Sequence, residues 1–597
     1  MDNYFVSSCK RVKDWICRQF GQKEKKTVHH KNFADGGEVI VWETGRAGEE
    51  AASYENLFLR KEIAGFRTNI RREQSCSIKS LTRDYLYEQL LSSGEYTFDH
   101  MLVIKDPYGE APLTALALFI LEEPACVRVT TRGDLKETDF VTELPKKKEH
   151  RVPILGMYAE KANTIVIEIL DDEGNCVKSH AFTIRTKRLP KSLRNVITVK
   201  KWTDKPAYSN IMINGGVKIH TCVFDIEGKI RYYLSRKPRG YGIFPLSDGH
   251  FFYMEKYISV PSYSNPQTVE SYDMDYFGRV FRTYLTEKGV HHTAEEKAGG
   301  NILTGSNSML EHTEDCVIEI DRQTGEIVWQ LNMEELFDET YQNMMDWCHV
   351  NSAAYYEKDR TILISLRNVH AVICVDYDTK KLRWILSDPK FWEGTKMTPY
   401  LLQPEGDVKW CYQQHAAFEI ALPDESNPQK KRIIVYDNHW AKRRKAKSFD
   451  KDPLSYVSFY DIDEEKKTVS LHKRFAGPKT RIRANGIYVP DKKRVYNMAG
   501  SYAEPVDGDG GGIFEYDYET GEVLSEFGVK PGFFRAYPFE PNVQELAEPM
   551  QVTGDYQVGQ IKQPQEISSS KYCKLKSEKK HHIKSAAIEY EMQEDLL

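Results

Sequence analysis

Hydrophobic and polar positions alternate over short runs along most of the chain, and this pattern predicts β-strands joined by tight turns. In "NTIVIEILDDEGNCVKSHAFTI" two alternating strands flank a hairpin turn. Several such runs, split by turn residues, predict a small β-sandwich at residues 97–190. Residues 1–95 form a charged, mixed extension with helical spacing at 81–96, and their remaining structure stays unassigned.

From residue 197 to 540 one unit recurs: an apolar strand, an aspartate, a turn rich in Gly, Lys and Glu, and a second strand. The aspartates of the six copies are Asp225, Asp275, Asp321, Asp376, Asp461 and Asp517, at intervals of 50, 46, 55, 85 and 56 residues. A period near 50 with paired strands predicts a six-bladed β-propeller, whose blades bury their faces by stacking around one axis. The expected fold class is therefore all-β. The 85-residue interval contains "KRRKAKSFDKDPLS", which we expect on a surface loop.

Composition narrows the class of protein without naming a function. The 83 basic and 88 acidic residues leave a net charge of −5, which gives no indication of a nucleic-acid partner. Eleven scattered cysteines without metal-ligand spacing indicate reduced thiols. No apolar run is long enough for a signal peptide or a membrane helix, so we expect a cytoplasmic protein without a membrane partner. The polar tail at 543–597 is expected to be extended or partly disordered.

Four side chains carry the candidate chemistry: His292, His349, His415 and Arg367. Each histidine lies at the beginning of a strand in a different copy of the repeat, so all three are expected to face the axial channel. Arg367 ends the strand that follows His349, so it is expected at the same end of the axial channel. Three imidazoles and a guanidinium would form an anion site for a sulfate or phosphate group. Histidine can also act there as acid, base or nucleophile.

The same spacing has a structural explanation, because repeated blades also generate matched hydrogen-bonded histidines. No carboxylate recurs beside the histidines, which disfavours glycosidase chemistry and a hard-metal site, and no metal is expected. Nearby aromatic residues fit either an aryl pocket or blade packing: Trp347, Tyr355, Tyr356, Phe391 and Trp392.

Several motifs occur together between about 97 and 540: "HRVPILGMY", "HHTAEEKAGGNIL", "DWCHVNS", "ILISLRN", "WILSDPKFW" and "QQHAA". As a set and in this order they resemble the bacterial arylsulfate sulfotransferases, the PAPS-independent aryl sulfotransferase family. The resemblance implies an N-terminal β-sandwich, a six-bladed propeller and a homodimer. It also implies sulfuryl transfer from a phenolic sulfate ester to an acceptor phenol by a ping-pong route. No cofactor is expected, and the chain has no P-loop motif.

By this resemblance His415 is the nucleophile that forms a sulfohistidine. His292, His349 and Arg367 would hold the sulfuryl oxygens and stabilise the departing phenolate. Asn351 would help to orient the group.

His291 stays a second candidate beside His292, which we favour as the residue facing the site. Thr293 stands where the family commonly has Asp, and Ala416 lies in a similar setting, so the supporting contacts of both histidines are open. Two other hypotheses remain: a propeller that only binds partners, and a hydrolase that uses a metal held by the histidines.

Overall fold

The computed structural model describes residues 28–33, 37–51, 75–203, 205–215, 219–236, 241–254, 269–286, 289–308, 312–337, 346–422, 426–440, 452–550 and 565–567. The basic part of the predicted insertion, at 442–451, and the tail beyond 567 lie outside these residues. Within the described ranges, no helix is long and apolar enough to cross a membrane.

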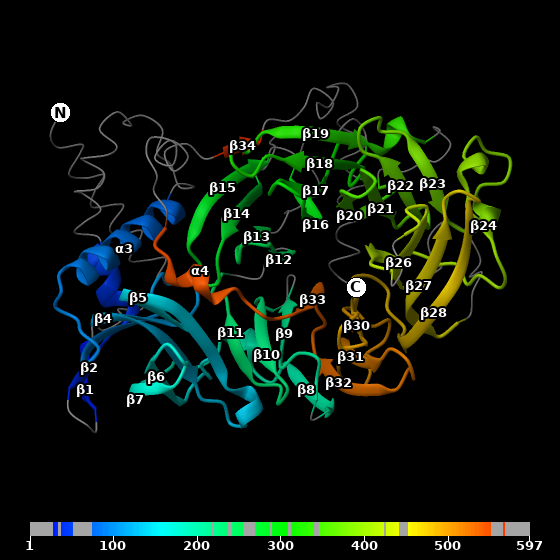
Figure 1. Ribbon diagram of the computed structural model, residues 1–597. Coiled ribbons are helices and arrows are strands. Elements are labelled where there is room, and N and C mark those ends of the chain that lie inside the picture. The colour runs from blue at the N-terminus through cyan, green and yellow to red at the C-terminus, as the bar shows by residue number, and fades with distance from the viewer. Residues whose placement is uncertain are drawn as a thin grey trace, which may run out of the picture.

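Six antiparallel sheets form the blades of a propeller, which confirms the predicted fold class (Figure 1). Blade 2 contains β12 (Gly242–Pro245), β13 (Phe251–Met254), β14 (Val269–Met274) and β15 (Val280–Thr286). Blade 3 contains β16 (Val290–Glu296), β17 (Ile302–Ser306), β18 (Cys316–Ile320) and β19 (Ile327–Asn332). Blade 4 contains β20 (Val350–Tyr356), β21 (Thr361–Leu366), β22 (Ala371–Asp376) and β23 (Leu382–Leu386). Blade 5 contains β25 (His415–Ile420), β26 (Lys430–Asp437), β27 (Leu454–Asp463), β28 (Thr468–Pro478) and the short β24 (Gln403–Pro404).

The ring is closed by strands from both ends of the repeat region. Blade 6 consists of β29 (Asn485–Val489), β30 (Arg494–Ala499), β31 (Gly511–Asp517), β32 (Val523–Val529) and, at its outer edge, β8 (Ile197–Lys201). Blade 1 consists of β9 (Asn210–Asn214), β10 (Cys222–Asp225), β11 (Ile230–Tyr233) and, as its innermost strand, β33 (Arg535–Pro538). The propeller therefore has no open first or last blade, because early and late strands share two of its sheets.

The recurring aspartates shape the turn between the last two strands of a blade. Asp225 accepts backbone N–H groups of Glu227 (3.1 Å) and Lys229 (3.0 Å), and Asp321 and Asp517 cap their turns in the same way. Blade 5 differs, because Asp463 caps the turn while Asp461 pairs with Arg432. The repeat was visible in the sequence because this turn chemistry is local.

The N-terminal strands form one seven-stranded sheet that folds over a shared core. Its strands are β1 (Val28–Asn32), β2 (Glu38–Trp42), β3 (His100–Lys105), β4 (Ala115–Thr131), β5 (Phe140–Ile154), β6 (Ala162–Leu170) and β7 (Cys176–Arg185). The long β4 pairs with β3 near its beginning and with β6 near its end. Phe33, just after β1, stacks on His180 of β7. The sheet thus encloses a sandwich-like core.

The extension that the sequence left unassigned contributes to this domain. The strands β1 and β2 belong to the sheet, and β2 pairs in parallel with β3. The helix α3 (Ser75–Ser92) begins six residues before the helical spacing at 81–96 had indicated. At the other end, α4 (Val543–Ala547) and β34 (Gln565–Ile567) lie within the region expected to be extended. β34 pairs in parallel with β15 of blade 2.

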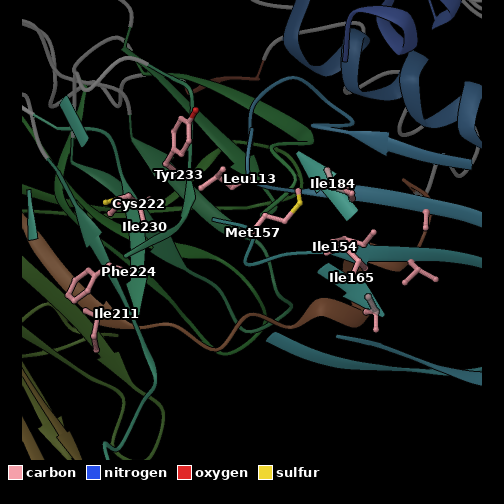
Figure 2. Close-up of a cluster of buried hydrophobic side chains, with 14 of the residues drawn as sticks. Leu113, Ile154, Met157, Ile165, Ile184, Ile211, Cys222, Phe224, Ile230 and Tyr233 are labelled. Carbon is pink, nitrogen blue, oxygen red and sulfur yellow. The ribbon is translucent and has the colours of Figure 1, made fainter. Parts of the chain in front are cut away.

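One hydrophobic cluster spans the N-terminal sheet and blade 1 (Figure 2). Ile154 and Ile184 come from the sheet, Ile211 and Phe224 come from blade 1, and Met157 lies between the two groups. Because these side chains are almost fully buried, the two domains share part of one core.

Candidate active site

The structure brings His292, His349, His415 and Arg367 together at the inner strands of neighbouring blades. His292 lies in β16, His349 directly precedes β20, and His415 begins β25, so the imidazoles come from the inner strands of blades 3, 4 and 5. The ring centroids of His292 and His349 are 4.8 Å apart, and those of His349 and His415 are 6.5 Å apart. Arg367 follows β21 of blade 4, and its amide donates to the carbonyl of His349. All four side chains are buried.

The backbone at these positions is strained in a repeated way. His292 (φ 60°), His349 (φ 55°) and Ala416 (φ 48°) adopt left-handed conformations, which disfavour residues other than glycine. His292 and Ala416 lie within bulges where the inner strand loses register with its neighbour, and His349 directly precedes such a strand, whose bulge lies between Val350 and Ser352. Such bulges turn side chains away from the regular alternation of a strand, and here they occur beside all three imidazoles.

His415 has its ring held by two neighbouring residues. Its Nδ1 lies 2.6 Å from Oδ1 of Asn438, and its Nε2 accepts the backbone N–H of Arg483 at 3.3 Å. Burial, together with the positive charges of Arg367 and His349, lowers the pKa of His415 well below its usual value. His415 is therefore a neutral imidazole at neutral pH.

His349 has the opposite environment. Its Nδ1 lies 2.5 Å from Oε2 of Glu314 and 3.0 Å from Oδ2 of Asp346. Burial opposes the charged form, but the two carboxylates outweigh it and raise the pKa of His349 to about 9. His349 is therefore an imidazolium at neutral pH, with its Nε2–H left to donate.

These contacts correct one expectation from the sequence. We expected no carboxylate beside the histidines, yet Glu314 and Asp346 contact His349, and Glu314 also lies 3.7 Å from Nδ1 of His292. Asp346 was visible three residues before His349 in "DWCHVNS". Glu314 comes from the loop before β18 of another blade, and no local pattern connected it with the site.

His291 and His292 form a hydrogen-bond chain with one possible direction. Nε2 of His291 lies 2.9 Å from the carbonyl of Ser306, which can only accept, so this nitrogen carries the proton. Burial lowers the pKa of His291, so its ring is neutral and its Nδ1 accepts from Nδ1 of His292 at 3.1 Å. His291 packs over Gly305, where an added Cβ would lie 2.6 Å from its ring, and His292 faces His349.

This chain determines what His292 can do. Burial and the neighbouring His349 and His291 lower the pKa of His292 well below its usual value, so the ring is neutral. Its Nδ1 holds the proton, and its Nε2 is left as an acceptor. In this state His292 is suited to accept a hydrogen bond and not to donate one to a sulfuryl oxygen.

Asn351 supports the neighbouring blade. Its side-chain amide donates to the carbonyl of Gln414 at 2.8 Å, directly before His415, and its buried Oδ1 has no hydrogen-bond partner among the described residues. The backbone carbonyl of Asn351 accepts from Nη2 of Arg535 at 2.6 Å.

Arg535 of β33 is a further cation at the axis that the sequence analysis missed. It is 1% exposed, and no carboxylate within the described ranges forms an ion pair with it. Its charge contributes to the lowered pKa values of both His292 and His415. Burial raises the pKa of the nearby Glu295 to about 7, against the opposing effect of Arg535. The basic character of the site therefore extends to blade 1.

The aromatic residues nearest to the imidazoles also differ from those that the sequence suggested. Tyr241 and Phe534 pack beside His292, at centroid distances of 4.8 and 5.9 Å, and contact each other at 4.9 Å. Trp347 and Trp392 are fully buried within the core of blades 3 and 4. These tryptophans are packing residues.

Two overlapping groups at the site have the geometry to hold a metal ion. One consists of His291, His292 and Glu314, and the other of Glu314, Asp346 and His349. The ion pairs of His349 with both carboxylates account for the second group without a metal.

Comparison with known proteins agrees with this architecture. The family model described as Arylsulfotransferase (ASST) matches residues 196–535, and the model described as Arylsulfotransferase Ig-like domain matches residues 102–187. Arylsulfate sulfotransferase AssT of Lelliottia amnigena is 21% identical, and the match covers 72% of this chain and 90% of that protein. AssT of an Escherichia coli O6:H1 strain is 22% identical with the same coverage.

Among solved structures, a protein of unknown function from Bacteroides caccae matches 55% of this chain and 98% of its own. Its identity of 11% and TM-score of 0.34 are too low to support an argument.

A six-bladed propeller with a buried cluster of imidazoles and guanidinium groups at its axis, preceded by an Ig-like domain, defines the class of protein. The chain belongs to the arylsulfotransferase family. It is accordingly an enzyme, an aryl sulfotransferase.

Proposed function

We propose that this enzyme moves a sulfuryl group from an aryl sulfate ester to an acceptor phenol in two half-reactions, with His415 as the intermediate carrier. The observation that carries the proposal is the pairing of unlike imidazoles: neutral His415 lies beside protonated His349. A nucleophile needs a lone pair and a leaving group needs a proton, and the two rings offer one each.

In the first half-reaction, Nε2 of His415 attacks sulfur and forms an N–S bond. The bond between sulfur and the aryl oxygen breaks, and the phenolate leaves with both electrons. His349 gives this oxygen the proton of its Nε2, because its Nδ1 faces Glu314 and Asp346. In the second half-reaction an acceptor phenol returns a proton to His349 and attacks sulfur, and the N–S electrons return to His415.

The pKa of about 9 suits His349 to both directions of this proton transfer. A phenol has a pKa of about 10, so acid and leaving group are closely matched, which favours general acid–base catalysis. Arg367 and Arg535 provide positive charge for the sulfuryl oxygens during transfer. The reaction as written uses no PAPS.

The remaining residues fit the handling of an aryl substrate. Tyr241 and Phe534 offer aromatic faces beside the reacting groups, where an aryl ring could stack. Nε2 of His292 can accept a hydrogen bond from the phenol hydroxyl. Asn351 holds the carbonyl before His415 and so supports the nucleophile.

The test is a single-turnover assay with 4-nitrophenyl sulfate and no PAPS, with and without added phenol. The wild type should give a nitrophenol burst without phenol, a mass gain of one sulfuryl group on the peptide containing His415, and turnover with phenol. His415→Ala should lose all three. His250→Gln is the matched control, because His250 is a half-buried, ion-paired histidine of blade 2 outside the site. An active His415→Ala variant would contradict the proposal.

A metal-assisted hydrolase is the second candidate, and the donor groups that include Glu314 support it. Activity that disappears with a chelator and returns with Zn²⁺ would favour this candidate. Phenol-dependent transfer that is unchanged by chelation would exclude it.

We propose two further properties. The family resemblance supports a homodimer, to be tested by sedimentation equilibrium. The pattern of scattered thiols supports a cytoplasmic enzyme, to be tested by cell fractionation. The cysteines at 126, 176, 222, 316, 348, 374 and 411 are free thiols, as expected in a reducing compartment.

A further inference from the structure

The ring nitrogen of His415 that does not react is held by a neutral amide. Asn438 directly follows β26 and is fully buried, and its Oδ1 lies 2.6 Å from Nδ1 of His415. His349, in contrast, has the carboxylates of Glu314 and Asp346 at the same ring position. One site therefore contains two imidazoles with chemically different supports.

The orientation of the Asn438 amide follows from its other contacts. Its Nδ2 donates to the backbone carbonyl of Arg483 at 3.1 Å and to Oγ1 of Thr480 at 2.8 Å. A carbonyl can only accept, so the nitrogen of the amide must point toward Arg483 and the oxygen toward His415. Nδ1 of His415 therefore carries the proton, and the lone pair lies on Nε2.

The backbone around Asn438 is fixed as well. Oγ of Ser455 donates to the carbonyl of Asn438 at 2.7 Å and accepts the N–H of Thr480 at 2.8 Å. Asp437, the preceding residue, accepts the N–H of Tyr412 and the side chain of His439. Because these contacts come from three strands or loops of blade 5, the amide has little freedom to rotate.

We propose that Asn438 is the positioning residue that sets the reactivity of His415 through both half-reactions. An amide oxygen accepts a hydrogen bond but does not take the proton. Before transfer it keeps His415 as the neutral tautomer with its lone pair on Nε2. After transfer it leaves the proton on Nδ1, so the sulfohistidine ring is cationic. When the N–S bond breaks, the electron pair returns to Nε2 and His415 departs as neutral imidazole.

A carboxylate in this place would change both steps. Before transfer it would favour protonation of His415, as Glu314 and Asp346 do for His349. After transfer it could withdraw the Nδ1 proton, and the ring would then have to leave as an anion, which is a poor leaving group. The proposal rests on the proposed function, in which His415 carries the sulfuryl group.

The three charged groups with the largest effects on His415 favour its neutral form. They are Arg367 and His349 from blade 4 and Arg535 from blade 1. From blade 6, Arg483 contributes its backbone N–H to Nε2. None of these contributes a carboxylate, so a carboxylate placed at 438 would be the main opposing charge.

Asn438→Asp tests this with little change in side-chain volume. The burst of the first half-reaction should slow at least tenfold at pH 7, and its acid limb should move upward by one or more pH units. The preformed adduct should also react more slowly with added phenol. Asn438→Ala should slow both steps and move the acid limb downward, the opposite direction, because the hydrogen bond to Asn438 raises the pKa of His415. Asn163→Asp is the control for a buried amide changed to a carboxylate, because Asn163 lies in β6 of the N-terminal sheet, outside the site, and its side chain bonds the backbone of Tyr158.

A second measurement does not depend on activity. ¹⁵N spectra of histidine-labelled enzyme should show His415 protonated at Nδ1 in the wild type, and doubly protonated near neutral pH in folded Asn438→Asp. An Nε2–H tautomer in the wild type, or an unmoved acid limb in folded Asn438→Asp, would overturn the role of Asn438. Full activity of His415→Ala would instead overturn the proposed function, so the two failures are distinguishable.

Discussion

This protein has two buried clusters of charged residues, one between the two domains and one at the active site, and they differ in how their charges are paired. The interface cluster, formed by Asp84, Arg151 and Arg279, joins α3, the N-terminal sheet and blade 2. Asp84 binds Nη2 of Arg151 at 2.5 Å and accepts the N–H of Met550 at 2.7 Å. Arg279 lies 3.5 Å from Asp84 and donates to the carbonyl of Glu548 at 2.6 Å. The charges are thus paired and hydrogen-bonded.

The axial cluster, formed by His349, Arg367, Arg535 and the neutral rings of His292 and His415, is less balanced. Carboxylates contact His349, but Arg535 contacts a backbone carbonyl, the Tyr537 hydroxyl and an aromatic face, and forms no ion pair with a carboxylate of the described residues. Buried charge without an opposite charge is costly unless a ligand supplies it. The two clusters differ in how their charges are paired. Buried charges that pair with each other stabilise the fold, whereas buried cations without a paired carboxylate can bind an anionic substrate.

Breaking the interface cluster should have the largest effect. Asp84→Ala removes the buried carboxylate that Arg151 and Arg279 share and should lower the free energy of unfolding by about 3–5 kcal/mol. Among the described carboxylates, Arg151 then keeps only the partly exposed Glu88, and Arg279 keeps only Asp275. Urea unfolding followed by circular dichroism measures this. Glu88→Gln is the control, because Glu88 binds the same Arg151 but is partly exposed, and it should cost no more than about 1 kcal/mol. Equal losses in both variants would contradict the distinction.

Removing a cation from the axial cluster should mainly affect activity. Arg535→Gln should reduce kcat/KM about 10²-fold. Because Arg535 helps to lower the pKa of His415, its loss should raise that pKa and move the acid limb of the pH profile upward. Arg231→Gln removes another buried arginine of blade 1, one that pairs with Asp225, and should reduce stability without moving this limb.

The charge on His349 can be adjusted through one carboxylate. His349 must be protonated to assist the leaving phenolate, so activity should fall as pH rises through about 9. Glu314→Gln removes an ion pair, lowers the pKa of His349 and should move this alkaline limb to lower pH by one unit or more. Glu334→Gln, which loses a contact with His312 instead, should leave the limb in place.

The free energy of unfolding should also depend on the protonation of His349. The folded pKa of His349 lies above the ordinary value of about 6.5, so the ion pair stabilises the fold fully below that pH. This contribution should be lost as pH rises through about 9. Thermal unfolding of wild type and Glu314→Gln across this range should show a smaller loss, at lower pH, in the variant, in which only Asp346 still pairs with His349.

The smallest effect is expected at the rim of the interface cluster. Lys147 and Glu548 form an ion pair in which both side chains are about two-fifths exposed. Lys147→Met should change the free energy of unfolding by less than about 1 kcal/mol, and salt should diminish the difference. A loss as large as that of Asp84→Ala would show that exposure does not distinguish these pairs.

The propeller was predictable because its signals are local. A turn aspartate such as Asp225 accepts hydrogen bonds from residues two and four positions away. The residues that determine each hairpin therefore lie within a short stretch of sequence. The place of His292, His349 and His415 on successive inner strands followed from the same repeat. The N-terminal extension gave no such pattern, because β2 pairs with β3 across 57 residues of intervening sequence.

The electrostatics of the site were not predictable in the same way. Asn438 supports His415 from 23 positions away, and Arg535 reaches Asn351 across 184. Such pairs arise from ring closure and from packing between blades, and neither produces a periodic pattern in the sequence. The tautomers of His291 and His415 depend on single carbonyl groups, whose direction only the folded backbone defines.

The innermost strand of blade 1 is β33, which is made from residues 535–538, near the end of the described chain. During synthesis, the antiparallel strands of blades 2 to 6, three strands of blade 1 and the whole N-terminal sheet emerge before this strand does. A nascent chain therefore lacks Arg535 and Phe534, and its first blade lacks an inner edge, until translation has passed this point. Fragments from interrupted synthesis should be catalytically silent, so sulfuryl transfer begins only after the ring has closed.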